Sequence, residues 1–115
     1  MERHKEKDVL VIELTEEDLK DPVALNREFE EIIVDEEERK ILVELSAVKT
    51  MTSLMIGTIV SIHTVAYENV ALLKFTGLSK KVRMLFRLLG IDRLIEMHYG
   101  KQSALEELGR ARSDA

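Results

Sequence analysis

Short apolar runs and longer amphipathic segments alternate along the chain. Residues 9–12 form a β-branched run that Leu14 continues, and its lack of polar alternation predicts a strand covered on both faces. Similar runs at residues 41–45 and 70–75 predict two further strands, and a short last strand is expected at residues 94–98. The segments between these runs carry apolar residues at helical spacing.

Capping residues mark where the helices are expected to begin. Asp21 and Pro22 suit the cap and the first position of a helix whose apolar stripe includes Leu25 and Phe29. The preceding residues 15–20 are interpreted as an acidic connection.

Three further helices follow in the second half of the chain. Either Thr52 or Ser53 is expected to cap the first of them, and Ser79 is expected to cap the second, at residues 80–89. A final helix is predicted at residues 103–108.

This order of elements predicts an α/β fold, in which a mostly parallel sheet of four to five strands is covered by about four helices. The length of 115 residues fits one domain. We place that domain at residues 8–108, with a flexible N-terminus at residues 1–7 and a flexible tail at residues 109–115.

Composition narrows the classes of function. The chain has no cysteine, which excludes disulfides and thiolate metal sites, and its net charge of −5 does not favour nucleic-acid binding. The charged start is not a signal peptide, and the uncharged residues 50–67 hold too many hydroxyl groups for a membrane span. We therefore expect a cytoplasmic protein without direct membrane insertion.

No catalytic pattern stands out in the sequence. His4, His63 and His98 are scattered without metal-ligand spacing, and the five glycines are isolated rather than gathered in a phosphate-binding loop. No pair of carboxylates can be singled out as acid and base. The expectation is a protein that is not an enzyme and needs no metal or cofactor.

The helix that starts near residue 53 has more apolar residues than one core face requires. One stripe holds Met55 and Ile59, and a second holds Ile56 and Val60. Either the surplus faces a protein partner, because exposed apolar patches often mark interaction sites, or a neighbouring helix covers it. Full burial of all four side chains would exclude the first alternative.

Three stretches of the sequence resemble the STAS family of anti-sigma-factor antagonists. Residues 45–57 (LSAVKTMTSLMIG) are similar to the family's signature, in which Asp-Ser-Ser/Thr-Gly-Leu-Gly opens a helix after a strand and loop. Residues 75–79 (FTGLS) resemble its strand–Gly-Leu-Ser–helix segment, and residues 89–94 (LGIDRL) resemble its Gly-Leu-Asp-Arg-Leu passage. With the opening strand and helix, the resemblance covers residues 8–108.

The resemblance implies a regulatory module that binds an anti-sigma serine kinase and is switched by phosphorylation of a serine. The position that matches the family's phosphoacceptor is Ser53, and Thr52 is a second candidate. The sequence departs from the signature, because Thr52 replaces the Asp and Leu54 and Met55 replace a small polar residue and a Gly. A plain N-cap is the structural alternative for Ser53.

The partner-binding surface is expected at the start of this helix and in the acidic loop after the first strand. The residues assigned to it are Ser53, Met55, Ile56, Gly57, Val60, Asp18 and Asp21. Two other functions are compatible with the same fold: a partner subunit of a membrane transporter of the lipid-trafficking ABC type, and a scaffold subunit of a stress-signalling assembly. A monomer or weak dimer is expected.

Overall fold

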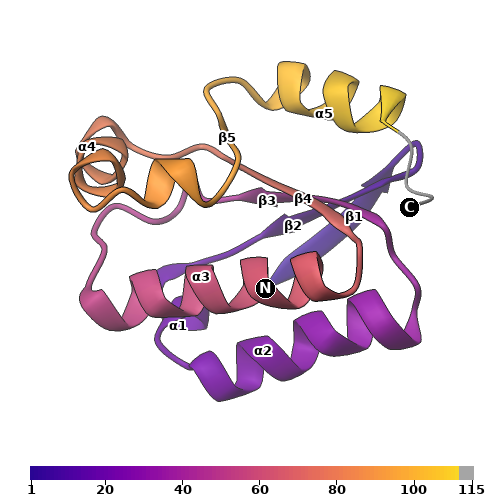
Figure 1. Cartoon of the computed structure of the whole chain (residues 1–115), viewed down its shortest axis with the longest axis horizontal. Helices are drawn as coiled ribbons and strands as arrows, with labels where there is room; N and C mark the ends of the chain where they lie inside the picture. Colours follow the sequence, from indigo (N-terminus) through magenta and orange to yellow (C-terminus); the bar gives the residue numbers. More distant parts are fainter. Residues whose placement is uncertain (112–115) are drawn as a thin grey trace.

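A five-stranded sheet forms the centre of the computed structural model, which describes residues 1–111 (Figure 1). Its strands are β1 (Glu2–Glu6), β2 (Val9–Glu13), β3 (Lys40–Glu44), β4 (Leu72–Thr76) and β5 (Met97–His98). They lie in the order β1-β2-β3-β4-β5, with β1 antiparallel to β2 and all other pairs parallel. This arrangement confirms the predicted α/β fold with a mostly parallel sheet.

Helices cover both faces of this sheet. They are α1 (Glu16–Leu19), α2 (Pro22–Glu30) with the π-helical turn η1 (Glu31–Asp35), α3 (Ser53–Glu68), α4 (Lys80–Leu88) with the 3-10 turn η2 (Ile91–Arg93), and α5 (Lys101–Arg110). Figure 1 shows α1, α2 and α3 on one side of the sheet and α5 on the other, while α4 lies beyond the carboxyl end of β4.

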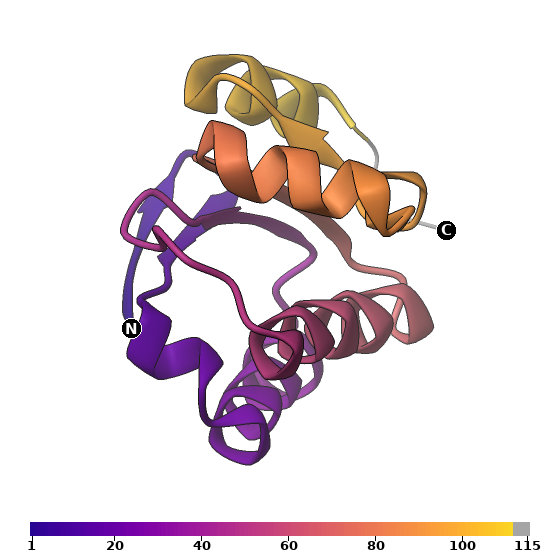
Figure 2. The same ribbon diagram turned by 90° about the vertical axis from the view of Figure 1, so that its left-hand side faces the viewer.

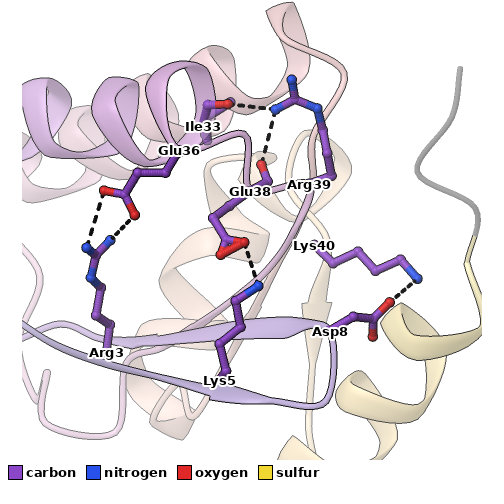
Figure 3. A network of polar contacts seen from close by, with 8 residues as sticks. All are labelled: Arg3, Lys5, Asp8, Ile33, Glu36, Glu38, Arg39 and Lys40. Carbon is purple, nitrogen blue, oxygen red and sulfur yellow. Dashed lines mark hydrogen bonds and ion pairs between the residues drawn. The ribbon is translucent and has the colours of Figure 1, made fainter.

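The prediction of a flexible N-terminus at residues 1–7 is wrong, because β1 pairs with β2 along its whole length. Its side chains are polar throughout, so no apolar pattern revealed the strand. Backbone hydrogen bonds and ion pairs hold it instead: Arg3 pairs with Glu36 at 3.2 Å, and Lys5 with Glu38 at 2.5 Å (Figure 3). Charged side chains also suit an exposed edge strand, because they discourage pairing with another sheet.

Two other boundaries differ from the expectation. Residues 16–19, interpreted as part of a connection, form the short helix α1. Helix α5 extends through Gly109 and Arg110, which were placed in the flexible tail. Ala111 is the C-cap of this helix, and residues 112–115 of that tail lie outside the described residues.

The core has two parts, one on each face of the sheet. The larger part lies between the sheet and the layer of α1, α2 and α3, and it includes Ile12, Phe29 and Phe75. The smaller part joins β2 and β3 to α5 through Val11 and Leu108, among others. Successive residues of β2 point to opposite faces, which explains why its sequence lacks polar alternation. Among the described helices, none has the length and apolar character that a membrane crossing requires.

Candidate partner-binding site at the start of helix α3

Helix α3 begins after a loop, residues 45–52, that follows the carboxyl end of β3. Thr52 is its N-cap: the backbone is extended there, and the side-chain oxygen accepts a hydrogen bond from the N–H of Met55 at 3.3 Å. Ser53 is the first helical residue and is exposed. Its hydroxyl makes no hydrogen bond with any of the described residues. The alternative that Ser53 is the cap is therefore wrong.

The start of α3 is electrostatically suited to a negative group. The first turn contains no acidic side chain, and the N–H groups of a first turn lack carbonyl partners within the helix. The helix dipole adds partial positive charge at this end. A phosphate on Ser53 would thus meet free donors and a favourable field, which allows the fold to tolerate it.

The loop before α3 is fixed at two places. On one side, the Glu16 carboxylate of α1 accepts hydrogen bonds from the Lys49 N–H at 3.0 Å and from the Thr50 hydroxyl at 3.3 Å. The hydrogen bond from Lys49, followed by those from Thr50, lowers the pKa of Glu16 below its ordinary value. Sequence reasoning noticed Glu16 only as part of an acidic stretch, and no local pattern indicated its distant partners.

On the other side, the loop lies against the turn that follows β4. The Leu45 N–H donates to the Thr76 carbonyl at 2.8 Å. Gly77 has a φ of +80°, and a Cβ there would lie 2.4 Å from the Ser46 Oγ and 2.9 Å from the Ser46 backbone nitrogen. Only glycine fits this position without displacing the loop. Gly77 thus sets the path of the loop toward Ser53.

The apolar surplus of α3 is divided between core and surface. Met55 and Ile59 are fully buried, so the assignment of Met55 to a partner-binding surface is wrong. Ile56 and Val60 are half-buried, and Gly57 is exposed. The alternative of complete cover by a neighbouring helix is therefore excluded for this end of α3.

Leu54 also belongs to the exposed part, although the sequence did not single it out. Its side chain is 52% exposed. It follows Ser53 directly and projects about 100° around the helix from it, and both side chains lie at the exposed N-terminal end of α3. We define the α3 start surface as Ser53, Leu54, Ile56, Gly57 and Val60.

Asp18 and Asp21 have intramolecular roles as helix caps. Asp18 completes a capping box of α1, in which its carboxylate accepts from the Thr15 N–H at 2.8 Å. Asp21 caps α2 by accepting from the Ala24 N–H at 3.2 Å. These contacts explain both acidic residues structurally, and their contact with a partner stays a prediction.

One group of side chains has the composition of a metal site. Glu96, His98 and Glu107 lie together near the end of β5 and on α5. The ammonium group of Lys74, a residue only 7% exposed, pairs with Glu96 and, at 3.1 Å, with Glu107. Burial lowers the pKa of Lys74, but these hydrogen bonds outweigh it and the net pKa is raised. The lysine thus already occupies both carboxylates of this group and offsets one of their two negative charges.

The other two histidines lie apart from this group. His4 pairs with Glu6 at 2.9 Å in β1. His63 stacks on Tyr67 along α3 with ring centroids 6.3 Å apart, and burial lowers its pKa. The structure therefore does not bring the three histidines together.

Comparison with known proteins agrees with this geometry. The family model described as STAS domain matches residues 2–104. One similar solved structure is that of Thermotoga maritima TM1081, described as a candidate anti-sigma factor antagonist. It superposes with a TM-score of 0.72 at 22% identity, and the match covers 95% of this chain and 94% of that chain. A search of curated protein sequences gave no significant match.

Two further solved structures come from stress signalling. A Moorella thermoacetica RsbS variant with a serine-to-glutamate substitution gives a TM-score of 0.81 at 17% identity, with 93% of this chain and 95% of that chain covered. A protein chain from a structure of the stressosome, described as a signal integration and transduction hub, superposes with a TM-score of 0.80 at 20% identity. The match covers 94% of this chain and 96% of that chain. At these identities the likeness shows a shared fold.

Proposed function

The chain belongs to the STAS domain family, and on this premise we propose that it is an anti-sigma-factor antagonist-like regulatory module. It binds an anti-sigma serine kinase through the α3 start surface, and phosphorylation of Ser53 ends this binding. The observation that carries the proposal is the position of Ser53, an exposed serine at the first position of α3 whose neighbour Thr52 already supplies the cap.

The surface around Ser53 combines apolar and small residues. Leu54 is 52% exposed, and the half-buried Ile56 and Val60, four residues apart on one side of α3, lie next to the exposed Gly57. Gly57 has no heavy atom within 4 Å of an added Cβ, so neither the core nor a turn accounts for a glycine here. A partner's backbone can approach closely at such a residue.

Phosphorylation would change this surface without changing the fold. It adds a charge of about −1.5 to −2 at neutral pH, and a desolvated contact over Leu54 and Ile56 cannot accommodate such a charge unless the partner supplies cations. The helix N-terminus stabilises the phosphate on the module itself. A neighbouring structure, RsbS, was solved with a serine replaced by glutamate, a change that likewise adds negative charge.

Incubation with serine kinases from the same organism and ATP, followed by intact mass and peptide mapping, tests the proposal. We expect one phosphate on Ser53 and none on the Ser53→Ala variant. Ser103→Ala is the matched control, because Ser103 is also an exposed serine in the first turn of a helix, α5. Phosphate on Thr52 alone, or on no residue of a folded sample, would contradict the assignment of Ser53.

Binding is measured separately from phosphorylation. The unmodified protein should bind the kinase, whereas Ser53→Glu should bind at least tenfold more weakly because of the charge added to the interface. Leu54→Ala removes apolar contact area without adding charge and should weaken binding by a smaller factor. Equal affinity of all three proteins would refute the role of this surface.

A scaffold subunit of a stress-signalling assembly is the second candidate. The similarity of the fold to a chain of the stressosome favours it, as does the absence of the signature Asp at Thr52. Under this alternative the purified protein enters a large multi-subunit particle with its cognate partners, which sedimentation distinguishes from a small complex with a kinase.

A further inference from the structure

Helix α4 and the turn after it carry a second surface, on which exposed apolar side chains stand among basic ones. Four of the ten large apolar residues found exposed among the described residues fall within eleven positions: Met84 at 55%, Leu88 at 82%, Leu89 at 57% and Leu94 at 49%. Single exposed apolar residues are common in soluble proteins, but such a group on one segment indicates an interaction site.

Positive charge is concentrated on the same segment. Residues 80–94 contain five basic residues and one acidic residue, a net charge of +4 in a chain whose total is −5. The basic residues are Lys80, Lys81, Arg83, Arg87 and Arg93. The remaining chain therefore carries a net charge of −9, so this segment is the positive pole of an otherwise acidic protein.

The geometry of α4 brings the two kinds of side chain together. Val82 and Phe86 point into the core, so the opposite side of the helix faces solvent. Met84 and Leu88, four residues apart, share the middle of that outer side. At 100° per residue, Lys81 falls on one flank of this pair and Arg87 on the other.

Figure 1 shows α4 at one end of the molecule's long axis, and Figure 2 shows it on the outside of the fold. An exposed fraction of 82% means that Leu88 projects from the surface instead of lining a groove. Projecting apolar residues ringed by Lys and Arg are the features by which peripheral proteins attach to anionic bilayers.

We propose that the outer side of α4, where Met84 and Leu88 lie among Lys80, Lys81 and Arg87, binds an anionic lipid bilayer. Met84 and Leu88 enter the interfacial layer, and the basic side chains contact lipid phosphates. Nucleic acid fits less well, because phosphates gain nothing from the exposed Met84 and Leu88. An acidic protein would need a cavity shaped for Leu88, whereas a bilayer adapts to any projecting side chain. This proposal is independent of the role of Ser53.

Cosedimentation of the full chain with lipid vesicles tests the proposal. We expect binding to vesicles rich in phosphatidylglycerol, little binding to pure phosphatidylcholine, and a loss of binding as salt is raised. Replacement of Leu88 by Ser should weaken binding about tenfold, because it removes one inserted apolar side chain. Replacement of Lys80 or Lys81 by Gln should cost about fivefold for each charge removed.

Val23→Ser is the matched control, because Val23 is 68% exposed but lies on α2, outside this surface. It should leave vesicle binding unchanged, and circular dichroism checks that each variant is folded. If Leu88→Ser does not fold, Met84→Ser replaces it. The proposal is overturned if anionic vesicles do not bind, if neutral vesicles bind equally well, or if Val23→Ser weakens binding as much as Leu88→Ser. It is also overturned if duplex DNA binds more tightly than the vesicles and displaces them regardless of Leu88.

Discussion

Replacing Gly77 by Ala should destabilise the protein more than the same change at Gly90, although both glycines have positive φ. The φ values are +80° and +75°, so the conformational penalty for a side chain in this left-handed region, about 1–2 kcal/mol, is nearly the same. The two positions differ in the space around them. A Cβ on Gly90 meets no atom within 4 Å, whereas one on Gly77 lies 2.4 Å from the Ser46 Oγ and 2.9 Å from the Ser46 nitrogen.

The difference between the two variants isolates the steric contribution. We expect Gly90→Ala to lower the free energy of unfolding by about 1 kcal/mol and Gly77→Ala to lower it by about 2–4 kcal/mol, because the backbone of residue 46 must shift. Urea denaturation followed by circular dichroism measures both values. Adding Ser46→Gly to Gly77→Ala removes the contact with Oγ but keeps the contact with the backbone nitrogen, so it should restore part of the loss.

Equal destabilisation by the two alanine substitutions would show that the loop at Ser46 moves away at no cost. The argument that Gly77 fixes the path of the loop toward Ser53 would then fail. If the argument is right, Gly77→Ala also weakens partner binding under conditions where the protein remains folded, because the loop leads directly into the α3 start surface.

Three further predictions concern individual contacts. Thr52→Ala should lower the free energy of unfolding by about 1 kcal/mol, because it removes the cap of α3. Ser53→Ala should change this free energy by less than about 0.5 kcal/mol, and urea denaturation measures both values. The lowered pKa of Glu16 means that its contribution to stability is present above its ordinary pKa and is lost as the pH falls through the lower, folded-state value. The protection factor of the Lys49 amide, which is corrected for the slower intrinsic exchange at low pH, should therefore fall on acidification in the wild type, and the Glu16→Gln variant should not show this dependence. Replacing both Glu96 and Glu107 by Gln leaves the ammonium of Lys74 without its carboxylates and should lower the free energy of unfolding by about 2 kcal/mol. Lys74→Met should change it little, because both glutamates reach water. Similar losses for the two variants in urea or thermal unfolding would contradict this account.

The sequence was sufficient to predict elements whose apolar pattern faces the core. The run at residues 9–12 indicated a strand covered on both faces, and β2 has that environment. The edge strand β1 could not be found in this way, because its side chains Arg3 and Lys5 pair with distant Glu36 and Glu38. Its stability comes from backbone pairing and long-range ion pairs, which leave no periodic signal in the local sequence.

The same limit applies to the candidate site. Ser53 was found because it matches a motif, and the motif does not say which of two adjacent hydroxyl residues caps the helix. The hydrogen bonds of Glu16 reach Lys49 and Thr50, which lie 33 and 34 positions further along the chain, so only the folded structure reveals them. Met55 was misassigned because an apolar residue near a helix start is compatible with either core or surface until the orientation of the helix is known.

The orientation of α3 changes how the departures from the signature should be weighed. Residue 55 points into the core and is fully buried, so a methionine there fills core volume and does not obstruct a partner as an exposed side chain would. Thr52 stands where the family has Asp, and both residue types accept a hydrogen bond from the first turn of a helix. A threonine also places no negative charge beside the proposed phosphate on Ser53. The substitutions therefore preserve the cap and the packing that the proposed switch requires, and Thr52→Asp should keep the stability that Thr52→Ala loses. If Thr52→Asp is instead as unstable as Thr52→Ala in urea denaturation, the two residues are not equivalent as caps, and the departure from the signature has a structural cost.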